Sequence, residues 1–399
     1  MKVHIIRGQN QIGGSIIEVC SSTTKIILDI GSELGEEIPV IPNIDGLFQG
    51  LPLYDAVLTT HYHGDHIGLI ENILPGIPVY MGEKAFRIHQ AASQYLNKPT
   101  IIPSYFLHAG EEIIIGDIKI VPLLCDHSAF DSYMLLISCE GKRLLYTGDF
   151  RANGRKYFSF LLKRLPNIDI LITEGTTLSR PHLTTLTEQD LEEKAIRNIS
   201  KLSDQPVFVC MAATNIDRLV TMYRVAKRTG RIFLEDVYTA AIAAAAGDNI
   251  PNPLSFCDVR TFLTAPTEKQ YAILQRYNGS KIGRAEISKK RFIMCVRPSM
   301  KAYLEKLNDQ LSFHGGCLFY SMWDGYMDNE DVSDFLQYMK RTGVSIEQLH
   351  TSGHADTKTI DELIMHTKPK YILPVHTEKA SWFERYKTCK VIHESTYSF

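Results

Sequence analysis

The segment THYHGDH at residues 60–66 constrains this chain more than any other feature of its sequence. It follows the apolar run AVLT at 56–59, which predicts a buried strand. The polar side chains at the strand end are His61, His63, Asp65 and His66. The first two point to the same side of an extended segment, and Gly64 lets the backbone bend so that the last two face a second point. Imidazole and carboxylate ligands suit zinc and tolerate manganese or iron, so the segment predicts a pair of divalent metal ions.

The composition is that of a folded protein, with 44% hydrophobic and 22% charged residues. A chain of 399 residues favours two lobes, or one large fold with an insertion. The net charge of -2 gives no bulk attraction to nucleic acid, so a polyanion site needs a local cluster or metal ions. Eight scattered cysteines without a CxxC pair argue against a disulfide framework and indicate a reducing, cytoplasmic compartment. No apolar run approaches the roughly 20 residues of a membrane span, so we expect no membrane association.

The pattern of predicted strands and helices changes twice along the chain. Residues 1–178 contain short strands and few helices, one of them expected at HIGLIENIL, residues 66–74. Residues 179–346 show a β–α–β–α rhythm, which is typical of an α/β lobe with some parallel strands. Residues 347–399 return to short strands. We therefore predict an α+β sandwich, formed by 1–178 and 347–399, with a lobe inserted at 179–346.

A strand followed by HxHxDH resembles the signature of the metallo-β-lactamase superfamily, which implies an αββα sandwich. The resemblance also implies further ligands at the ends of apolar strands. His127 in LLCDHSAFDS matches the histidine of the third motif, and Asp149 in LLYTGDF matches the aspartate that bridges both metals. Asp29 in IILDIG matches the aspartate of the first motif, which usually supports the loop rather than touching a metal.

The later motifs resemble those of the β-CASP nucleases, most closely the ribonuclease J branch. Glu174 in LITEGTT occupies the place of motif A, His354 in HTSGHAD matches motif B, and His376 in YILPVHTE matches motif C. The inserted lobe lies between TGDF and SGHA, as in that family. The resemblance implies one metal bound by His61, His63, His127 and Asp149. It implies a second metal bound by Asp65, His66, Asp149 and His376.

The same resemblance implies roles for other residues. Asp65 would also orient the nucleophile, and His354 would contact the scissile phosphate or protonate the leaving group. Glu174 would fix the tautomer of His354 and raise its pKa. Four side chains are candidates for hydrogen bonds to a substrate phosphate: His350, Ser352, Asn215 and Arg218. For the last two, helix capping and an ion pair are the alternative roles.

The sequence thus predicts a two-metal phosphodiester hydrolase, with zinc as the expected metal and manganese or iron as alternatives. We expect a ribonuclease that cleaves single-stranded RNA as an endonuclease, a 5′-exonuclease or both, and by analogy with the family a homodimer. Other hypotheses are a small-molecule hydrolase acting on a thioester, lactone or phosphodiester, a DNA nuclease, and a non-catalytic scaffold. The inserted lobe favours a nuclease, because a small substrate needs no long covered channel, and the complete ligand set disfavours a scaffold.

Overall fold

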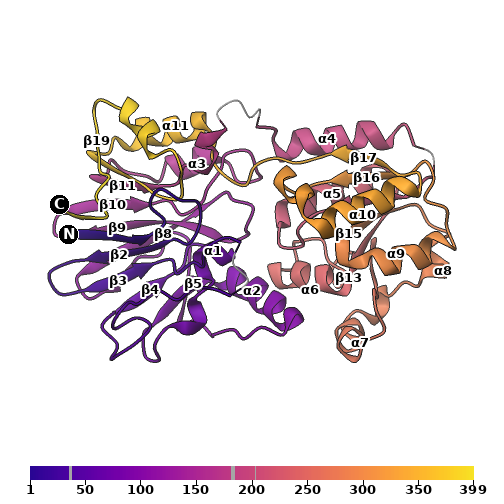
Figure 1. The fold of residues 1–399 in the computed structure, drawn as a ribbon, viewed down its shortest axis with the longest axis horizontal. Coiled ribbons are helices and arrows are strands. Elements are labelled where there is room, and N and C mark those ends of the chain that lie inside the picture. Colours follow the sequence, from indigo (N-terminus) through magenta and orange to yellow (C-terminus); the bar gives the residue numbers. More distant parts are fainter. Residues whose placement is uncertain (36–37, 181–184, 203) are drawn as a thin grey trace. The chain divides into compact units, whose positions relative to one another are not determined.

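A computed structural model describes residues 1–35, 38–180, 185–202 and 204–399 of the chain (Figure 1). The chain divides into two compact units, the first formed by Met1–Thr184 with Gly353–Phe399 and the second by Thr185–Ser352. The second unit begins and ends a few residues later than the boundaries 179 and 346 expected from the sequence. At its end the reason is strand β17 (Ser345–Gln348), which pairs with β16 (Cys317–Tyr320) inside the second unit.

Two seven-stranded sheets form the first unit, and each is antiparallel at one side and parallel at the other. The first sheet has the order β20-β1-β2-β3-β4-β5-β6. Its strands are β1 (Lys2–Arg7), β2 (Ile16–Cys20), β3 (Lys25–Leu28), β4 (Ala56–Leu58), β5 (Val79–Gly82), β6 (Tyr105–Leu107) and β20 (Thr396–Ser398). The second sheet has the order β19-β18-β11-β10-β9-β8-β7. Its strands are β7 (Ile113–Ile115), β8 (Ile118–Cys125), β9 (Ser132–Cys139), β10 (Lys142–Tyr146), β11 (Ile170–Thr173), β18 (Tyr371–Pro374) and β19 (Lys390–Val391).

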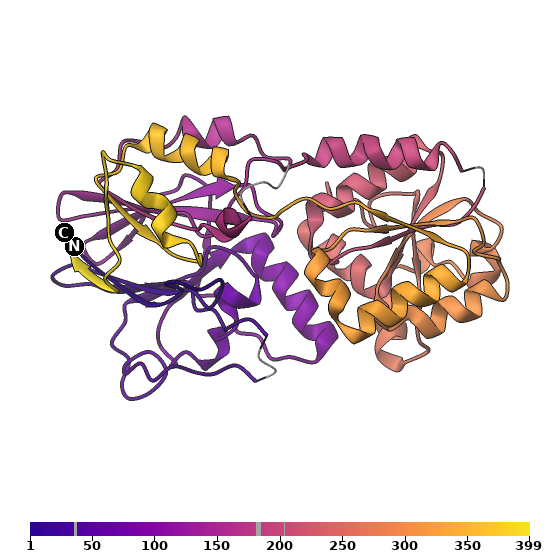
Figure 2. The ribbon, with the colours of Figure 1, turned by 45° about the horizontal axis from the view of Figure 1, so that its top comes forward.

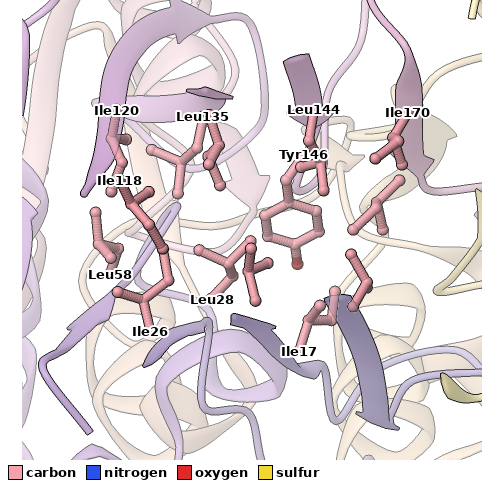
Figure 3. Packing of buried hydrophobic residues seen from close by; sticks show 14 of the residues in the cluster. Ile17, Ile26, Leu28, Leu58, Ile118, Ile120, Leu135, Leu144, Tyr146 and Ile170 are labelled. Carbon is pink, nitrogen blue, oxygen red and sulfur yellow. The ribbon is translucent and has the colours of Figure 1, made fainter. Parts of the chain in front are cut away.

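The inner faces of these two sheets share one hydrophobic core. Leu28 of the first sheet and Leu135 and Leu144 of the second belong to the same fully buried cluster (Figure 3). Helices α3 (Phe158–Leu162) and α11 (Thr357–Thr367) cover the outer face of the second sheet, and α2 (Glu83–Leu96) packs beside β5 of the first (Figure 2). This is the αββα sandwich that the sequence predicted.

The helix expected over residues 66–74 is wrong in its extent. The structure has a short α1 (Gly64–Ile67) and a separate 3-10 turn, η1 (Ile70–Asn72). Between them the Leu69 amide donates to the carbonyl of Ile30 at 3.0 Å. That tertiary hydrogen bond takes the amide out of the helical ladder, and it ties the residues just after α1 to Ile30, next to Asp29.

The second unit is an α/β lobe with a six-stranded sheet of order β14-β13-β15-β12-β16-β17, parallel throughout. Its other strands are β12 (Val207–Cys210), β13 (Ile232–Asp236), β14 (Val259–Phe262) and β15 (Phe292–Val296). Its helices are α4 (Glu188–Ile199), α5 (Ile216–Arg228), α6 (Val237–Ala246), α7 (Glu268–Gln275), α8 (Arg284–Ile287), α9 (Lys301–Asn308) and α10 (Glu330–Arg341). Across the described parts of both units, none of the helices has the length and apolar character needed to span a membrane.

Candidate metal centre

The predicted ligands of the first unit all follow strand ends. The loop 60–66 follows β4, His127 follows β8, Asp149 follows β10 and His376 follows β18. The structure gathers them into two groups, within each of which the ligand atoms lie within 4.8 Å of one another. One group is His61, His63, His127 and Asp149, and the other is Asp65, His66, Asp149 and His376. All seven side chains predicted as metal ligands are therefore brought together, with Asp149 common to both groups.

Asp149 lies at the middle of the cluster. Its Oδ2 is 3.3 Å from His66 Nε2 and 3.8 Å from His61 Nε2, and its Oδ1 is 3.8 Å from His376 Nε2. Both carboxylate oxygens are buried without a hydrogen-bond partner, as are His61 Nε2 and His66 Nε2. Buried polar atoms without partners cost free energy, and divalent cations would satisfy all four at once. The donor set therefore fits two divalent metal ions.

A hydrogen-bond relay fixes the tautomer of His61. The Thr60 hydroxyl donates to Asp29 Oδ2 at 2.9 Å and so accepts from His61 Nδ1, 3.0 Å away. Nε2 of His61 is then unprotonated and directed into the cluster, as a metal ligand must be. Thr60 was not predicted from the sequence, although it stands directly before the first histidine of the motif.

Three other imidazoles, those of His66, His127 and His376, are also held through Nδ1. His66 Nδ1 donates to Asp29 Oδ2 at 2.8 Å, and His127 Nδ1 donates to the carbonyl of Gly353 at 2.6 Å. His376 Nδ1 lies 2.9 Å from the Thr176 hydroxyl, which itself donates to Glu174 Oε2 at 2.7 Å. Asp29 thus accepts hydrogen bonds from Thr60 and His66 of the loop. Thr176 supports His376 in a similar way, and its place two residues after Glu174 was the signal in the sequence.

Burial sets the protonation of three of the histidines. It lowers the pKa of His61 and of His127 well below the ordinary value, and neighbouring imidazoles lower both further. Burial also lowers the pKa of His63 to about 4, against the nearby carboxylates of Asp65 and Asp149. These rings are neutral at pH 7, which is the state that binds a metal.

At Asp149 and at His66, neighbouring groups of opposite charge outweigh the effect of burial on the pKa. Burial alone would raise the pKa of Asp149, but His376, His66 and His354 outweigh it and hold that pKa well below the ordinary value. Burial disfavours charge on His66, yet Asp149, Asp29 and Asp65 raise its pKa well above the ordinary value. A cation at Nε2 of His66 would take the place of this proton among the same carboxylates.

His354 and Glu174 form a pair beside the cluster. His354 Nδ1 donates to Glu174 Oε2 at 3.1 Å and lies 3.5 Å from Asp149 Oδ2. Burial opposes protonation of the ring, but Glu174 and Asp149 prevail and raise the pKa of His354 to about 9. Glu174 is itself held by the amide of Phe150 at 3.0 Å. The arrangement favours a protonated imidazole beside the two ligand groups.

The four predicted phosphate contacts belong to the second unit. Asn215 caps α5 by accepting from the Arg218 amide at 3.1 Å. Arg218 is fully buried, and its guanidinium makes two hydrogen bonds of 3.1 Å with the Glu188 carboxylate. For these two residues the geometry favours the alternative roles, capping and ion pairing. For Arg218 the expected phosphate contact is therefore corrected, because a buried guanidinium committed to a carboxylate is unavailable to a ligand. His350 and Ser352 stay predictions.

A buried ion pair that the sequence analysis missed joins two of the ligand loops. Arg151 Nε donates to Asp126 Oδ2 at 3.1 Å, and both side chains are buried. Asp126 precedes His127, and Arg151 follows two residues after Asp149. Gly154 also donates its amide to Asp126 Oδ2, at 2.7 Å. The signal in the sequence for this ion pair was a charged residue within two positions of each of two predicted ligands.

Gly31 is required by the close approach of two backbone segments. A Cβ at this position would lie 1.7 Å from the carbonyl oxygen of Asp65. Gly31→Ala is expected to lower the free energy of unfolding by about 1–3 kcal/mol and to weaken metal binding, because the loop that bears Asp65 and His66 must move. Urea denaturation of the metal-free protein and zinc titration measure the two effects.

Gly64→Ala is the matched control within the same loop. Its nearest neighbour would be the Ser32 hydroxyl at 3.8 Å, an ordinary contact. We expect it to change the free energy of unfolding by no more than about 0.5 kcal/mol. Equal stability of the two variants would show that the approach of Gly31 to Asp65 does not constrain the loop.

Known proteins resemble this chain in sequence along most of its length. Residues 341–388 match the family model described as "Zn-dependent metallo-hydrolase RNA specificity domain". Ribonuclease J of Sinorhizobium meliloti is 22% identical over 378 residues, covering 89% of this chain and 64% of that protein. Ribonuclease J 1 of Streptococcus pyogenes serotype M3 is 23% identical and covers 94% of this chain and 68% of that protein. An RNase J-like protein of Methanocaldococcus jannaschii is 27% identical over 58% of this chain and 56% of its own length. The chain therefore matches between 56% and 68% of the length of these relatives.

A solved structure shares the fold. The crystal structure of a protein of unknown function from Enterococcus faecalis V583 superposes with a TM-score of 0.82 and 19% sequence identity. The superposition covers 100% of this chain and 99% of that chain. The likeness extends over both units and concerns the fold alone.

Proposed function

We propose that this chain is a metal-dependent ribonuclease, similar to the ribonuclease J-like proteins of the metallo-β-lactamase superfamily. The observation that carries the proposal is the arrangement of two four-ligand groups around Asp149, with the His354–Glu174 pair beside them. The names of the relatives, all ribonuclease J or RNase J-like, supply the substrate class. Zinc is the expected metal, in keeping with the description of the matching family model.

In phosphodiester hydrolysis, one set of residues would bind the metal ions and another would act on the phosphate. His61, His63, His127 and Asp149 would hold one metal, and Asp65, His66, Asp149 and His376 the other. Divalent ions in such a site supply activated water at neutral pH and neutralise the charge of the phosphoryl oxygens. His354, protonated and oriented by Glu174, would contact the scissile phosphate or give a proton to the leaving oxygen.

We take single-stranded RNA as the substrate and a cytoplasmic location as the setting. All eight cysteines are free, which suits a reducing compartment. A homodimer is the expected assembly by analogy with the family, and light scattering after gel filtration tests it.

Removal and return of metal tests the proposed activity. The full chain is incubated with single-stranded RNA, single-stranded DNA of the same sequence, bis(p-nitrophenyl) phosphate and a thioester. We expect RNA to be cleaved fastest, a chelator to abolish cleavage, and zinc or manganese to restore it, because the ligand groups supply no nucleophile of their own. Turnover of the thioester with no cleavage of RNA under any metal would overturn the proposal in favour of a small-molecule hydrolase, and faster cleavage of DNA would favour a DNA nuclease.

A further inference from the structure

The segment that follows Asp149 has a charge unlike that of the whole chain. Residues 151–164, RANGRKYFSFLLKR, contain five arginines and lysines and no acidic residue, whereas the chain has a net charge of -2. The Arg151 guanidinium pairs with the buried Asp126 carboxylate, whose other oxygen lies 3.9 Å from Lys156 Nζ, but Lys163 and Arg164 are exposed. This is a local positive cluster of the kind that a polyanion site requires.

Exposed aromatic side chains lie among these cations. Tyr157 is 75% exposed and Phe160 is 62% exposed, and their rings meet edge to face with centroids 5.8 Å apart. Lys163 Nζ lies 5.4 Å from the centre of the Phe160 ring. The opposite face of α3 places Phe158 and Leu161 in the core, so the helix is firmly seated while it holds two aromatic rings in solvent.

A third aromatic ring links this segment to the metal centre. Phe130 stands three residues after His127, and its amide donates to the hydroxyl of Tyr62, the residue between two of the ligands, at 2.8 Å. Lys156 Nζ lies 5.3 Å from the centre of the Phe130 ring, and Lys84 Nζ lies 5.7 Å from it. Lys156 directly precedes Tyr157 in the chain, so aromatic rings and cations alternate from the His127 loop outward to the end of α3.

We propose that this α3 strip, defined as Phe130, Lys156, Tyr157, Phe160, Lys163 and Arg164, binds the single strand of RNA next to the metal centre. Bases stack on Tyr157 and Phe160, and the cations neutralise the adjoining phosphates. Stacking on exposed aromatic rings combined with a basic track is how proteins hold single strands without reading their sequence. The inference rests on the proposed function, whose substrate it extends beyond the scissile bond.

The charge of the segment favours RNA over a second copy of the chain. In a symmetric dimer built on this surface the same patch would face itself, and the cations of residues 151–164 would oppose cations. A polyanion meets no such repulsion. A dimer through α3 is therefore an outcome that the experiment can detect and not the occupant that we expect.

Two variants of the full chain test the strip. The first carries Tyr157→Ser with Phe160→Ser, and the second carries Lys163→Gln. The control variants are Leu51→Ser, at a site 81% exposed, and Lys119→Gln, at a lysine 57% exposed. Binding of fluorescein-labelled dodecauridylate is followed by anisotropy with EDTA present, so that no cleavage occurs, over a range of salt concentrations. Thermal unfolding checks that each variant is folded.

The expected results separate stacking from charge. The double aromatic variant should raise the Kd about tenfold or more at every salt concentration, with the salt dependence unchanged. Lys163→Gln should reduce the slope of log Kd against log salt by about 0.7. Both variants should hydrolyse bis(p-nitrophenyl) phosphate as the wild type does, because none of the three substituted residues belongs to the metal centre. The control variants should bind RNA with the wild-type Kd.

Two outcomes would overturn the proposal that the α3 strip binds RNA. One is an unchanged Kd for RNA in the double aromatic variant while the wild-type protein cleaves RNA. The other is a loss of self-association in that variant with RNA affinity intact, which would identify the surface as a contact between copies. If the wild type cleaves no RNA, the proposed function itself fails, and the two failures are therefore distinguishable.

Discussion

Asp149→Ala is expected to remove both metal ions and to lower turnover of RNA by at least about a thousandfold. Asp149 is the only described residue that belongs to both four-ligand groups, so its loss takes a ligand from each metal. Among the described residues neither of its oxygens has a hydrogen-bond partner, which suits both of them to bind a metal ion. Metal content by inductively coupled plasma mass spectrometry and steady-state RNA cleavage measure the two effects.

A stability measurement separates this loss from unfolding. The metal-free variant should unfold at a lower temperature than the metal-free wild type, because His66 and His354 lose the buried carboxylate beside them, yet it should remain folded at the temperature of the assay. Asp117→Ala, at a surface carboxylate of the same unit that accepts from Ser21, is the control and should retain two metals. Two tightly bound metals in Asp149→Ala would contradict the shared-ligand arrangement.

His354→Ala is expected to keep both metal ions and yet lose about a hundredfold to ten-thousandfold in kcat. The side chain belongs to neither four-ligand group, but it lies 3.5 Å from Asp149 Oδ2 and is held by Glu174 at 3.1 Å. Its protonated state suits it to a phosphate or a leaving oxygen, where charge develops during hydrolysis. Parallel measurements of metal content and of kcat reveal the split.

Two further variants show whether the loss of activity in His354→Ala is separate from the loss of metal. His63→Ala should lose metal together with activity, because His63 belongs to the first candidate ligand group. His108→Ala, at an exposed histidine of the same unit, should change neither. Equal metal loss in His354→Ala and His63→Ala would show that His354 is a ligand and not a proton donor or phosphate contact.

The sequence could indicate which side chains lie together in the candidate centre, because each candidate ligand follows an apolar strand. THYHGDH places four candidate ligands after one strand, and the resemblance to the metallo-β-lactamase signature implied the next three, each after an apolar run: LLCDH, LLYTGD and YILPVH. The αββα sandwich was likewise implied by the resemblance.

The remaining features depend on partners that lie far apart in the chain. Arg218 reads as a surface cation, but Glu188, thirty residues earlier, meets it inside the second unit. The interruption of the helix after Ile67 depends on the carbonyl of Ile30. The exposure of Tyr157 and Phe160 was also invisible, because apolar residues on a short helix are ordinarily expected to face the core.

Crystals of the full chain grown with zinc provide the most direct test, through anomalous diffraction on both sides of the zinc edge. Two anomalous peaks are predicted, one among His61, His63, His127 and Asp149 and the other among Asp65, His66, Asp149 and His376. Peaks elsewhere in the chain, or no zinc at either ligand group at saturating concentration, would contradict a two-metal centre at these strand ends.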